Sequence, residues 1–584
     1  MPYDIIVGRG EGDKKLFGKR GLIFLGKTYV TMGSYTSLSN PIYLDVARSH
    51  VILIAGKRGC LTGETKVFTD KGYKSIKDFN KKGDKVLSFN KDKKEFEWEN
   101  AELLEYPIKD EELLELEFED GKNIQLTKEH PLLKMITNNN QQELVWEDAK
   151  NLKKEDLILS LEDEFNPLKT ELVSLRIISI KEINGIDKVY DLSVNKNHSF
   201  IANGIISHNS GKSYTLGGMA EAISTLDYEE AQNIASLIFD TMGIFWTMKF
   251  KNHKDKALLD EWGLEERNIP IKVYVPFGYF NEFHDKGIPV DAEFAMKISD
   301  LTADDWVSLF QMKFTDSEAV LIESVVFELK KKGGYGFNEI RKLISKAENV
   351  SQDVKNSTSA LFDAAESWKV FDEKSGTAIK DLVKGGQTTV IDLSMYASSG
   401  SFNVRALIIG LVSKRLFNER MSERRNEEIQ AVQRGYNTLS FTLKREMPLV
   451  WIFVDEAHEF LPRDDKTPAS EALIQLLREG RQPGISLVLA TQQPGKIHTD
   501  AMTQSDVVIS HRVTAEQDIN SLNQIMQTYL YEGIKEKMNA LPHIKGSAIL
   551  LDDNSERIYP IRVRPRFTWH GGEAPTAVRA EKID

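Results

Sequence analysis

Two short stretches, Val51–Gly59 (VILIAGKRG) and Ser210–Ser213 (SGKS), decide how this chain is organised. The first is an apolar run that leads into a glycine-rich loop, and the second has the form in which such a loop ends. Residues 60–209 separate the two. Without that segment the join reads GKRGSGKS, which fits the phosphate-binding pattern G-x-x-x-x-G-K-[ST], after a strand and before a helical pattern that starts near Tyr214. The sequence therefore predicts a nucleotide site that cannot form until residues 60–209 have been removed.

The ends of this insert carry the residues that self-excision needs. Cys60 stands first, His208 and Asn209 stand last, and Ser210 follows. The Cys60 thiol can attack the Gly59 carbonyl and turn an amide into a thioester. The Ser210 hydroxyl can then take over the acyl group, and Asn209 can cyclise onto its own carbonyl and cut the chain. Cys60 is the only cysteine, which excludes an intrachain disulfide and a multi-cysteine zinc site.

Two internal blocks of the insert resemble those of inteins: Gly121–Pro131 (GKNIQLTKEHP) and Val189–Asn209 (VYDLSVNKNHSFIANGIISHN). The resemblance implies that Thr127 and His130 polarise the upstream scissile peptide bond. It also implies roles in the later steps for three further residues, with the last of them aiding the cyclisation of Asn209: Asp191, His198 and His208.

The rest of the insert fits a mini-intein with an all-β Hint-type fold. It contains β-type runs at Lys66–Thr69, Lys85–Phe89, Leu113–Phe118, Val173–Ile180 and Lys188–Val194. The segment Asn138–Leu172 is too short for the homing endonuclease that larger inteins carry. We expect the fold to bring both ends of the insert together, because proximity is the main catalytic resource for this chemistry.

Outside the insert, strand and helix patterns alternate, which predicts an α/β fold with a mostly parallel sheet. The strand patterns are Val51–Ala55, Ile271–Val275, Thr388–Asp392, Leu449–Val454, Ser486–Ala490, Val507–Ser510 and Ser547–Leu551. The helix patterns are Tyr214–Thr225, Phe402–Met421, Ser470–Glu479 and Ala515–Gln527. Residues Ala292–Lys374 are helix-patterned and predict a helical subdomain, and Arg420–Arg434 reads as a charged, solvated surface stretch.

A second nucleotide motif follows the strand pattern in Leu449–Phe460 (LVWIFVDEAHEF). Asp455 at the end of this strand can orient the Mg²⁺ shell, and Glu456 can activate the attacking water. In the joined loop, Lys212 meets the β- and γ-phosphates of ATP and Ser213 holds Mg²⁺. The phosphates would be cradled by the backbone N–H groups of Gly56, Lys57, Arg58, Gly59, Ser210, Gly211 and Lys212.

Together with this acidic strand, Leu476–Pro494 (LLREGRQPGISLVLATQQP) and Pro41–His50 (PIYLDVARSH) resemble the HerA/FtsK class of P-loop ATPases, and the archaeal-type, DUF87-type HerA branch fits best. The resemblance implies a RecA/FtsK-like core and a hexameric homo-oligomeric ring on double-stranded DNA. It implies that Gln492 senses the γ-phosphate. It also implies that Arg478 or Arg481 acts across a subunit boundary as an arginine finger, although ordinary helix-surface pairing is the alternative for both.

Two further expectations come with the HerA resemblance. HerA proteins carry a longer N-terminal barrel that helps to dock a NurA-like nuclease, whereas Met1–Asn40 can supply only a few strands, so this partner stays open. The C-terminal stretch Ser555–Gly572 (SERIYPIRVRPRFTWHGG) resembles an extended tail that packs on a neighbouring subunit.

The sequence therefore predicts the following order of parts: an N-terminal extein with a short β segment (1–59), a mini-intein (60–209), ATPase core (210–291), a helical subdomain (292–374), ATPase core with the acidic and sensor strands (375–566) and a C-terminal tail (567–584).

The composition limits the partners without naming one. The chain has 76 basic and 88 acidic residues, a net charge of −12, so nucleic-acid binding would need a local channel rather than a basic surface. A signal peptide and an apolar run of 18 residues are both absent, which predicts a cytoplasmic protein without a membrane partner. The leading hypothesis is a self-splicing precursor of an ATP-driven DNA translocase or helicase for DNA processing or repair. An ATP-driven packaging, conjugation or secretion motor and a non-motor ATP-binding assembly protein are the alternatives.

Overall fold

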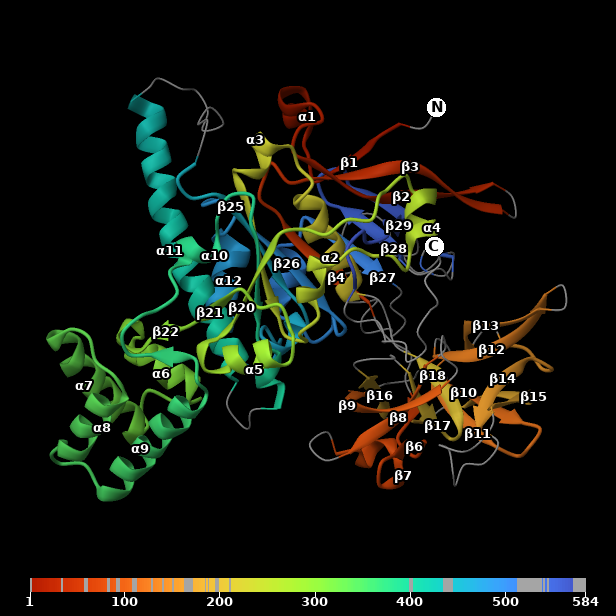
Figure 1. Cartoon of the computed structure of the whole chain (residues 1–584), viewed down its shortest axis with the longest axis horizontal. Coiled ribbons are helices and arrows are strands. Elements are labelled where there is room, and N and C mark those ends of the chain that lie inside the picture. The colour runs from red at the N-terminus through yellow and green to blue at the C-terminus, as the bar shows by residue number, and fades with distance from the viewer. Residues whose placement is uncertain are drawn as a thin grey trace. The chain divides into compact units, whose positions relative to one another are not determined.

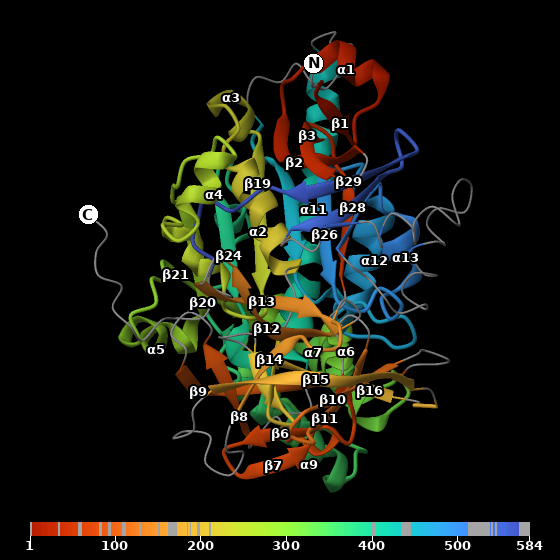
Figure 2. The same ribbon diagram turned by 90° about the vertical axis from the view of Figure 1, so that its right-hand side faces the viewer.

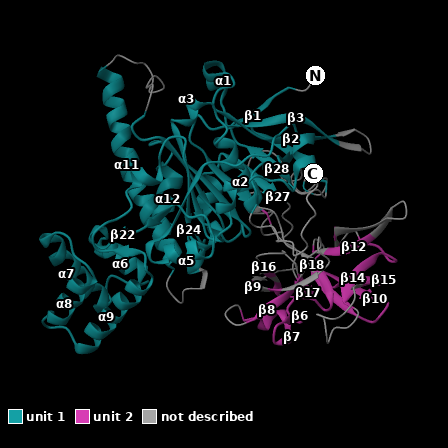
Figure 3. Cartoon of the chain, viewed as in Figure 1, with its two compact units in different colours: residues 1–55, 212–511, 521–571 teal, residues 56–211, 512–520, 572–584 magenta. Residues whose placement is uncertain are grey.

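The chain divides into two compact units, shown in two colours in Figure 3. Unit 1 consists of residues 1–55, 212–511 and 521–571, and the described part of unit 2 lies within residues 56–208. The computed structural model describes residues 3–32, 35–56, 61–80, 84–90, 95–107, 113–127, 130–138, 141–149, 152–161, 172–183, 185–186, 188–194, 199–208, 212–398, 403–433, 445–511, 522, 538, 541–542 and 546–570.

Unit 1 is built on a 13-stranded sheet with the strand order β1-β3-β2-β29-β28-β27-β4-β26-β25-β19-β24-β20-β21. All pairings from β27 to β21 are parallel, as the alternation of strand and helix patterns predicts. The strands of this parallel part are β4 (Val51–Ala55), β19 (Ile234–Asp240), β20 (Ile271–Pro276), β21 (Ala292–Phe294), β24 (Thr388–Asp392), β25 (Leu449–Val454), β26 (Ile485–Thr491) and β27 (Val507–His511).

The central strands are apolar on both faces because helices cover both faces. Every residue of β4, β19, β24 and β26 is buried. Helix α2 (Lys212–Ile223) packs against β4 and β26, and α12 (Ser470–Glu479) packs against β26 and α11 (Val404–Gln433). The seven predicted strands are confirmed. Strand β19, which is also fully buried, was not among the predicted strands.

The N-terminal residues extend the same sheet at one end, where β2, β3, β28 and β29 lie together (Figure 2). The pairings β27–β28, β28–β29, β29–β2 and β2–β3 are antiparallel. The elements of this part are β1 (Ile5–Val7), α1 (Glu11–Phe17), β2 (Leu22–Met32), β3 (Tyr35–Asp45), β28 (Ser547–Asp552) and β29 (Arg557–Val563). The N-terminal strands are thus part of the main sheet.

The helices α6–α9 form a cluster of their own beside the sheet (green in Figure 1). Their core contains the fully buried Trp306, which packs against Phe362 and Phe371 with ring centroids 5.0 and 5.1 Å away. The range 292–374 also has strands at both ends, since β21 belongs to the main sheet and β22 pairs with β23. The elements are α6 (Ala303–Leu309), α7 (Ser317–Lys332), α8 (Phe337–Lys346), α9 (Gln352–Ser367), β22 (Met296–Lys297) and β23 (Phe371–Asp372).

The long helix α11 continues through the charged stretch that the sequence suggested was solvated surface, so that interpretation was wrong for part of it. Arg420 is fully buried, and its guanidinium donates to the carbonyl oxygens of Pro483 and Met447, both at 2.9 Å. Glu427 faces it, with 3.3 Å between Oε1 and Arg420 Nη1. Buried charges are retained when they are paired and hydrogen-bonded, and composition alone does not reveal such pairing.

The remaining short helices connect the strands of unit 1. They are α3 (Tyr228–Ala231), α4 (Lys256–Glu261), α5 (Phe280–Asp285), α10 (Ile379–Leu382) and α13 (Thr499–Thr503). The predicted helix Ala515–Gln527 lies outside the described residues apart from position 522. Within the described part of the chain, none of the helices combines the length and the apolar character needed to cross a bilayer.

Unit 2 is an all-β structure, as the sequence predicted. Its 14-stranded sheet has the order β13-β12-β14-β15-β10-β11-β5-β16-β9-β8-β6-β17-β18, with β7 beside β6, and β18 also pairs with β12 and β14. The sheet therefore folds back on itself, and its described residues bury one large apolar cluster and two smaller ones. The strands are β5 (Leu61–Thr62), β6 (Lys66–Thr69), β7 (Gly72–Ser75), β8 (Lys85–Asn90), β9 (Glu95–Pro107), β10 (Leu113–Phe118), β11 (Asn123–Thr127), β12 (Pro131–Asn138), β13 (Gln141–Asp148), β14 (Leu157–Leu161), β15 (Leu172–Ile183), β16 (Lys188–Val194), β17 (Ser199–Ala202) and β18 (Ile205–His208).

Candidate functional site

The strand order of unit 1 brings the predicted nucleotide motifs to one edge of the sheet. Strand β26 lies between β4, which leads into the split loop, and β25, which carries the acidic motif. The parallel registers pair Ala55 with Thr491 and Leu489 with Val454, so all three strands end close together. In open parallel sheets, ligands bind at the carboxyl ends of the strands. This edge is therefore the candidate nucleotide site.

Ser213 and Asp455 meet at this edge although they are far apart in sequence. Ser213 stands in the first turn of α2 and donates a hydrogen bond from Oγ to Asp455 Oδ2 at 2.6 Å. The Asp455 side chain is buried, and its Oδ1 accepts from the backbone N–H of Glu456 at 2.9 Å. A hydroxyl beside a carboxylate is an oxygen donor set that suits Mg²⁺. The two residues assigned to magnesium from the sequence are thus adjacent.

Glu456 is held in an unusual backbone conformation beside the sensor strand. Its φ of 49° lies in the left-handed region, which costs a non-glycine residue about 1–3 kcal/mol and is found mostly at functional sites. Gln492 Nε2 donates a hydrogen bond to Glu456 Oε1. His458, which the sequence analysis did not single out, contacts the same group: its Nδ1 lies 3.1 Å from Thr491 Oγ1 and 3.6 Å from Glu456 Oε2.

Much of the phosphate-binding loop falls outside the described residues. Gly56 is buried directly after β4, and the backbone of Lys212 begins α2, but the Lys212 side chain is not described. The loop residues outside the description are Lys57, Arg58, Gly59, Ser210 and Gly211. The assignment of these residues to phosphate binding stays a prediction, whereas Ser213 and Asp455 fit Mg²⁺ by their chemistry and contact.

The two candidate arginine fingers lie at the opposite edge of the sheet from the nucleotide site. Arg478 Nε lies 2.6 Å from Asp500 Oδ2, and Arg481 Nη2 lies 2.8 Å from Asp506 Oδ1. Both arginines precede β26, a strand of seven residues, so a strand length of about 20 Å separates them from the chain's own nucleotide edge. Neither arginine can act on the nucleotide of its own subunit, which leaves a structural role or action on a neighbouring subunit.

A buried charge network ties the C-terminal segment to the helix of the phosphate loop. Glu221 of α2 is fully buried, and its carboxylate lies 2.7 Å from Arg566 Nε and 3.2 Å from Arg564 Nη2. The hydroxyl of Tyr214 accepts from the Arg566 N–H at 2.7 Å. A Cβ added at Gly217 would lie 2.5 Å from Arg566 Nη1, so this close approach requires glycine. Residues 564 and 566–568 are buried against their own chain, where they bind α2, and the packing of the tail on a neighbour stays a prediction.

A pair of buried aspartates at the same sheet edge was also missed from the sequence. Asp240 ends β19 and Asp392 ends β24, and the two are register partners. Asp240 accepts backbone hydrogen bonds from Gly243 at 2.7 Å and Phe245 at 2.8 Å, and Asp392 accepts from Ser394 at 2.9 Å. Burial, and then the neighbouring Asp392 carboxylate, raise the pKa of Asp240 to about 8. The pair therefore holds a proton at neutral pH.

We expect this pair to make unit 1 less stable as the pH rises. The pKa of Asp240 in the folded chain lies above the value of about 4 expected in the unfolded chain, so the folded state binds more protons between these two values. The free energy of unfolding should fall from about pH 4 to about pH 8 for this reason. Urea unfolding of the spliced product across this range should show a smaller decrease for Asp392→Asn, because the like charge is gone. An equal decrease in Asp392→Asn and in the exposed control Asp464→Asn would contradict it.

In unit 2 the strand registers link the two ends of the insert to one turn. Strand β5 directly follows Cys60, and its Leu61 pairs with Leu126 of β11. Strand β18 ends one residue before Asn209, and its Ser207 pairs with Leu132 of β12. The turn between β11 and β12 is flanked by Thr127, the last residue of β11, and by His130, which directly precedes β12. The strand before this turn, β11, therefore pairs with the first strand of the insert, and the strand after it, β12, pairs with the last.

Thr127 and His130 are placed together by this turn. Both side chains are buried, and the His130 N–H donates to the Thr127 carbonyl at 2.9 Å. The His130 ring packs on Phe200 of β17 with 6.5 Å between ring centroids. Asp191 lies in β16 and His208 in β18, but neither side chain is described. Cys60, His198, Asn209 and Ser210 lie outside the described residues, so the splicing roles of these six residues stay predictions.

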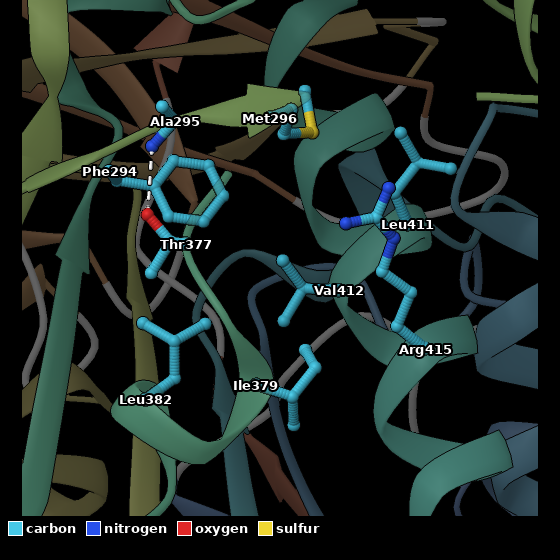
Figure 4. Close-up of a pocket in the computed structure, with 9 residues that line it drawn as sticks. All are labelled: Phe294, Ala295, Met296, Thr377, Ile379, Leu382, Leu411, Val412 and Arg415. Carbon is cyan, nitrogen blue, oxygen red and sulfur yellow. Dashed lines mark hydrogen bonds between the residues drawn. The ribbon is translucent and has the colours of Figure 1, made fainter. Parts of the chain in front are cut away.

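A pocket in unit 1 is separate from these sites. It lies among β21, β22, α10 and α11, and a hydrogen bond of 3.0 Å joins the Ala295 N–H to Thr377 Oγ1 at its rim (Figure 4). Arg415 is its only charged lining residue, and it lies 3.3 Å from Asp300. The lining is Phe294, Ala295, Met296, Thr377, Ile379, Leu382, Leu411, Val412 and Arg415. None of these residues belongs to β4, β25 or β26, and the mainly apolar lining does not suit phosphate.

The fold and contacts thus describe a P-loop-type α/β unit together with an all-β unit inserted at its phosphate loop. Residues 66–209 match the family model described as the intein splicing domain. Two solved inteins are similar to this part of the chain. The DnaX mini intein from Spirulina platensis is 26% identical, with a TM-score of 0.22, and the match covers 26% of this chain and 99% of that one. The DnaB intein from Synechocystis sp. is 23% identical, with a TM-score of 0.22 and the same coverage.

The chain is also similar to two curated helicases. A probable DNA double-strand break repair helicase HerA from Methanocaldococcus jannaschii is 25% identical over 270 residues, 44% of this chain and 48% of that protein. The DNA double-strand break repair helicase HerA from Pyrococcus furiosus is 25% identical over 146 residues, 23% of this chain and 26% of that protein. The matches thus span less than half the length of these relatives. The comparisons support a HerA-like chain that carries an intein insertion.

Proposed function

We propose that this chain is a self-splicing precursor and that its spliced product is an ATP-driven DNA translocase or helicase of HerA type, acting in DNA processing or repair. The observation that carries the ATPase proposal is the Ser213–Asp455 hydrogen bond of 2.6 Å beside Glu456 and Gln492. The splicing proposal rests on the family match over residues 66–209 and on the registers that link both ends of the insert to the turn with Thr127 and His130.

In the proposed splicing reaction, the Cys60 thiol attacks the Gly59 carbonyl and the released amine takes up a proton. His130 and Thr127 assist by hydrogen-bonding the peptide group that is attacked. The Ser210 hydroxyl then attacks the thioester carbonyl, and Cys60 leaves as a thiol. The Asn209 side-chain nitrogen attacks its own backbone carbonyl, which releases Ser210 with the N-terminal piece attached as an ester. An acyl shift to the Ser210 amine completes the new peptide bond.

Single substitutions should trap different species of this reaction. Asn209→Ala should block the C-terminal cut but still permit the thioester, so an added thiol should cleave after Gly59. Cys60→Ala should abolish the thiol-dependent cut and leave at most slow cleavage after Asn209. His130→Ala should slow the first step by about 10²-fold or more, because one positioned proton-transfer or hydrogen-bonding group is lost. Denaturing gels over time distinguish the species.

The matched control for these variants is His253→Ala. His253 lies in unit 1, its side chain is largely exposed, and its Nδ1 lies 2.7 Å from Glu266. Splicing by this variant should equal that of the parent chain. If Asn209→Ala, Cys60→Ala and His130→Ala all gave the same band pattern, the assignment of separate roles would be wrong.

In the spliced product, the joined loop and the start of α2 would hold the phosphates of ATP, and Ser213 and Asp455 would hold Mg²⁺, which would offset phosphate charge. Glu456 would accept a proton from the attacking water. Its contact with Gln492 would link this base to the end of β26, where Gln492 would sense the γ-phosphate. The polymer in the channel is proposed to be double-stranded DNA, the assembly a hexameric ring, and the location the cytoplasm.

DNA-stimulated hydrolysis of ATP by the spliced product is the experiment that tests this function. A clear rise in turnover with double-stranded DNA supports the translocase. A rate of ATP hydrolysis that is unchanged by DNA but rises with a polypeptide would favour a packaging, conjugation or secretion motor. No hydrolysis at all would favour an ATP-binding assembly protein. These assays do not test the binding of a NurA-like nuclease. In HerA proteins an N-terminal barrel helps to dock that nuclease, whereas the N-terminal strands of this chain belong to the main sheet.

Mixing subunits should reveal whether an arginine acts in trans. We expect Arg478→Ala alone and Glu456→Gln alone to be inactive, and mixed rings to regain activity at interfaces that pair an intact arginine with an intact glutamate. A trans finger contributes on the order of 10³-fold or more. Arg478 is the better candidate because its side chain is 60% exposed, whereas Arg481 is 40% exposed and shares Asp506 with the N–H of Val51.

The control for the mixing experiment is the exposed Arg425→Ala, which should be active without mixing. If sizing confirms intact rings and no mixing ratio restores turnover, Arg478 has a structural role. Repeating the experiment with Arg481→Ala decides the case for the second arginine.

A further inference from the structure

The strands of the N-terminal segment, residues 1–55, pair with strands formed by the residues that follow the insert. Strand β4 lies between β26 and β27, and both neighbours come from the far side of the insert in sequence. Its five residues have at most 1% of their surface exposed. The strand can leave only if two parallel ladders break and its apolar side chains enter water.

The other strands of this segment are held in the same way. Strand β2 pairs with β29 through Gly26–Val563, Lys27–Arg562 and Thr28–Ile561. The hydroxyl oxygens of Tyr29 and Ser547 lie 2.8 Å apart in the buried interior. These contacts join the segment before the insert to the segment after it. Splicing must connect the same two segments through one new peptide bond.

The helix that follows the insert is also in place beside β4. Leu216 and Met219 of α2 belong to the same buried apolar cluster as Ile52 and Ile54. The buried Glu221 network fixes α2 to residues 564–568. Both chain ends of the future phosphate loop, Ala55 and Lys212, are therefore held by the host unit itself, independently of any covalent link through the insert.

From these contacts we infer that residues 1–59 stay bound as a separate chain to the folded remainder when the Gly59–Cys60 bond is broken. The partner surfaces are the backbone edges of β26 and β27, between which β4 lies, and of β29, with which β2 pairs, and the occupant is the chain's own N-terminal segment. The host fold thereby holds the N-terminal segment, whose C-terminal acyl group is transferred, while the insert catalyses the steps of splicing. Premature cleavage yields a two-chain complex rather than free pieces.

The inference rests on the proposed splicing chemistry only for the way in which the bond is cut. In Asn209→Ala, the Cys60 thioester forms, and a small thiol then attacks its carbonyl. The thiol becomes bound to Gly59 as a new thioester, its proton passes to the Cys60 sulfur, and residues 60–584 keep a free N-terminal Cys60. The reaction is run on the full-length chain with an affinity tag at the N-terminus.

Two readouts separate the chemistry from the inference. A denaturing gel reports whether the bond is cut, and native affinity capture followed by size exclusion reports whether residues 60–584 remain with the tag. We expect nearly all of the cut chain to be captured and to elute at the size of the uncut one. Loss of residues 60–584 from the tag under native conditions would overturn the inference. If the thiol makes no cut, the splicing proposal fails, and a protease site placed between Gly59 and Cys60 answers the retention question instead.

A pair of glycine substitutions tests whether the strand contacts are responsible. A Cβ at Gly26 would lie 2.2 Å from the Arg562 carbonyl oxygen, so Gly26→Ala forces β2 away from β29. A Cβ at Gly12 in α1 meets nothing within 4 Å, so Gly12→Ala is the matched control. We expect the N-terminal piece to leave about ten-fold faster or more from the cut Gly26→Ala chain and at the parent rate from Gly12→Ala. Equal rates for both variants would show that β2 does not hold the piece.

Discussion

The unspliced chain should hydrolyse ATP at no more than background rate, whereas the spliced product should turn over. Strand β4 ends at Ala55 and α2 begins at Lys212, and both are packed in unit 1, so the insert interrupts the phosphate loop alone. A phosphate loop works through consecutive backbone N–H groups whose positions are fixed relative to each other. Removing even one such preorganised donor typically costs 10²–10³-fold in rate, so an open loop should cost about 10³-fold or more.

The test uses Cys60→Ala combined with Asn209→Ala, which cannot splice, and compares its ATP turnover with that of the spliced product. The control is a chain expressed without residues 60–209, whose loop reads GKRGSGKS and which should be as active as the spliced product. A second control adds Glu456→Gln to the unspliced chain and defines the background. Turnover of the unspliced chain at the spliced rate would refute the prediction, and an inactive chain without residues 60–209 would place the fault in the host.

The parts of this fold that could be read from sequence are those in which local pattern and tertiary environment agree. Strands β4, β25 and β26 are mainly apolar because they are buried on both faces. Each is followed directly by a residue to which the sequence assigns a role: Gly56, Asp455 and Gln492. Strand β19 (IASLIFD) has the same burial and, like β26, one buried serine, but no nucleotide motif follows it and the sequence patterns did not predict it. The Ser236 side chain is buried inside the sheet, so its polarity does not indicate that it is exposed to solvent.

The features that escaped the sequence are those made by partners far apart in the chain. Arg420 and Glu427 look like a solvated charge run until the carbonyls of Pro483 and Met447 are placed beside them. Glu221 is an unremarked acid within a helix pattern, and its partner Arg566 is 345 residues away. Long-range pairing of this kind follows from topology, which a periodicity argument does not contain.

The same limit applies to the candidate sites. Ser213, Asp455 and Glu456 were recognised because each stands at a fixed offset from a strand or a loop motif. The Asp240–Asp392 pair carries no such offset, and only the strand order brings it to the nucleotide edge. His458 lies in the acidic motif itself, three residues after Asp455, but its contact with Thr491 depends on the pairing of β25 with β26. For Arg478 and Arg481 the sequence left two roles open, and the sheet geometry removes action on the chain's own nucleotide but does not choose between a structural and a trans role.

Glu456→Gln should leave nucleotide binding intact and lower the turnover of the spliced product by about 10²–10⁴-fold, the usual contribution of a positioned general base. The substitution is nearly isosteric. Its amide oxygen can still accept the hydrogen bond that Gln492 Nε2 donates, so the contact between the acidic strand and β26 should survive. The backbone at this position already lies in the left-handed region, and glutamine adopts it at a cost similar to that of glutamate. The lost property is the ability to take a proton from water.

The matched control is Glu459→Gln, three residues further along the same turn. Glu459 Oε2 lies 2.8 Å from Arg405 Nη2 on the same connection but away from Gln492, so its loss should change turnover little. Turnover at saturating ATP and binding of a fluorescent ATP analogue should be measured for both variants. Loss of binding in Glu456→Gln would mean that the carboxylate positions the nucleotide rather than the water. Equal loss of turnover in Glu456→Gln and Glu459→Gln would mean that the turn as a whole, and not a base at position 456, is what hydrolysis requires.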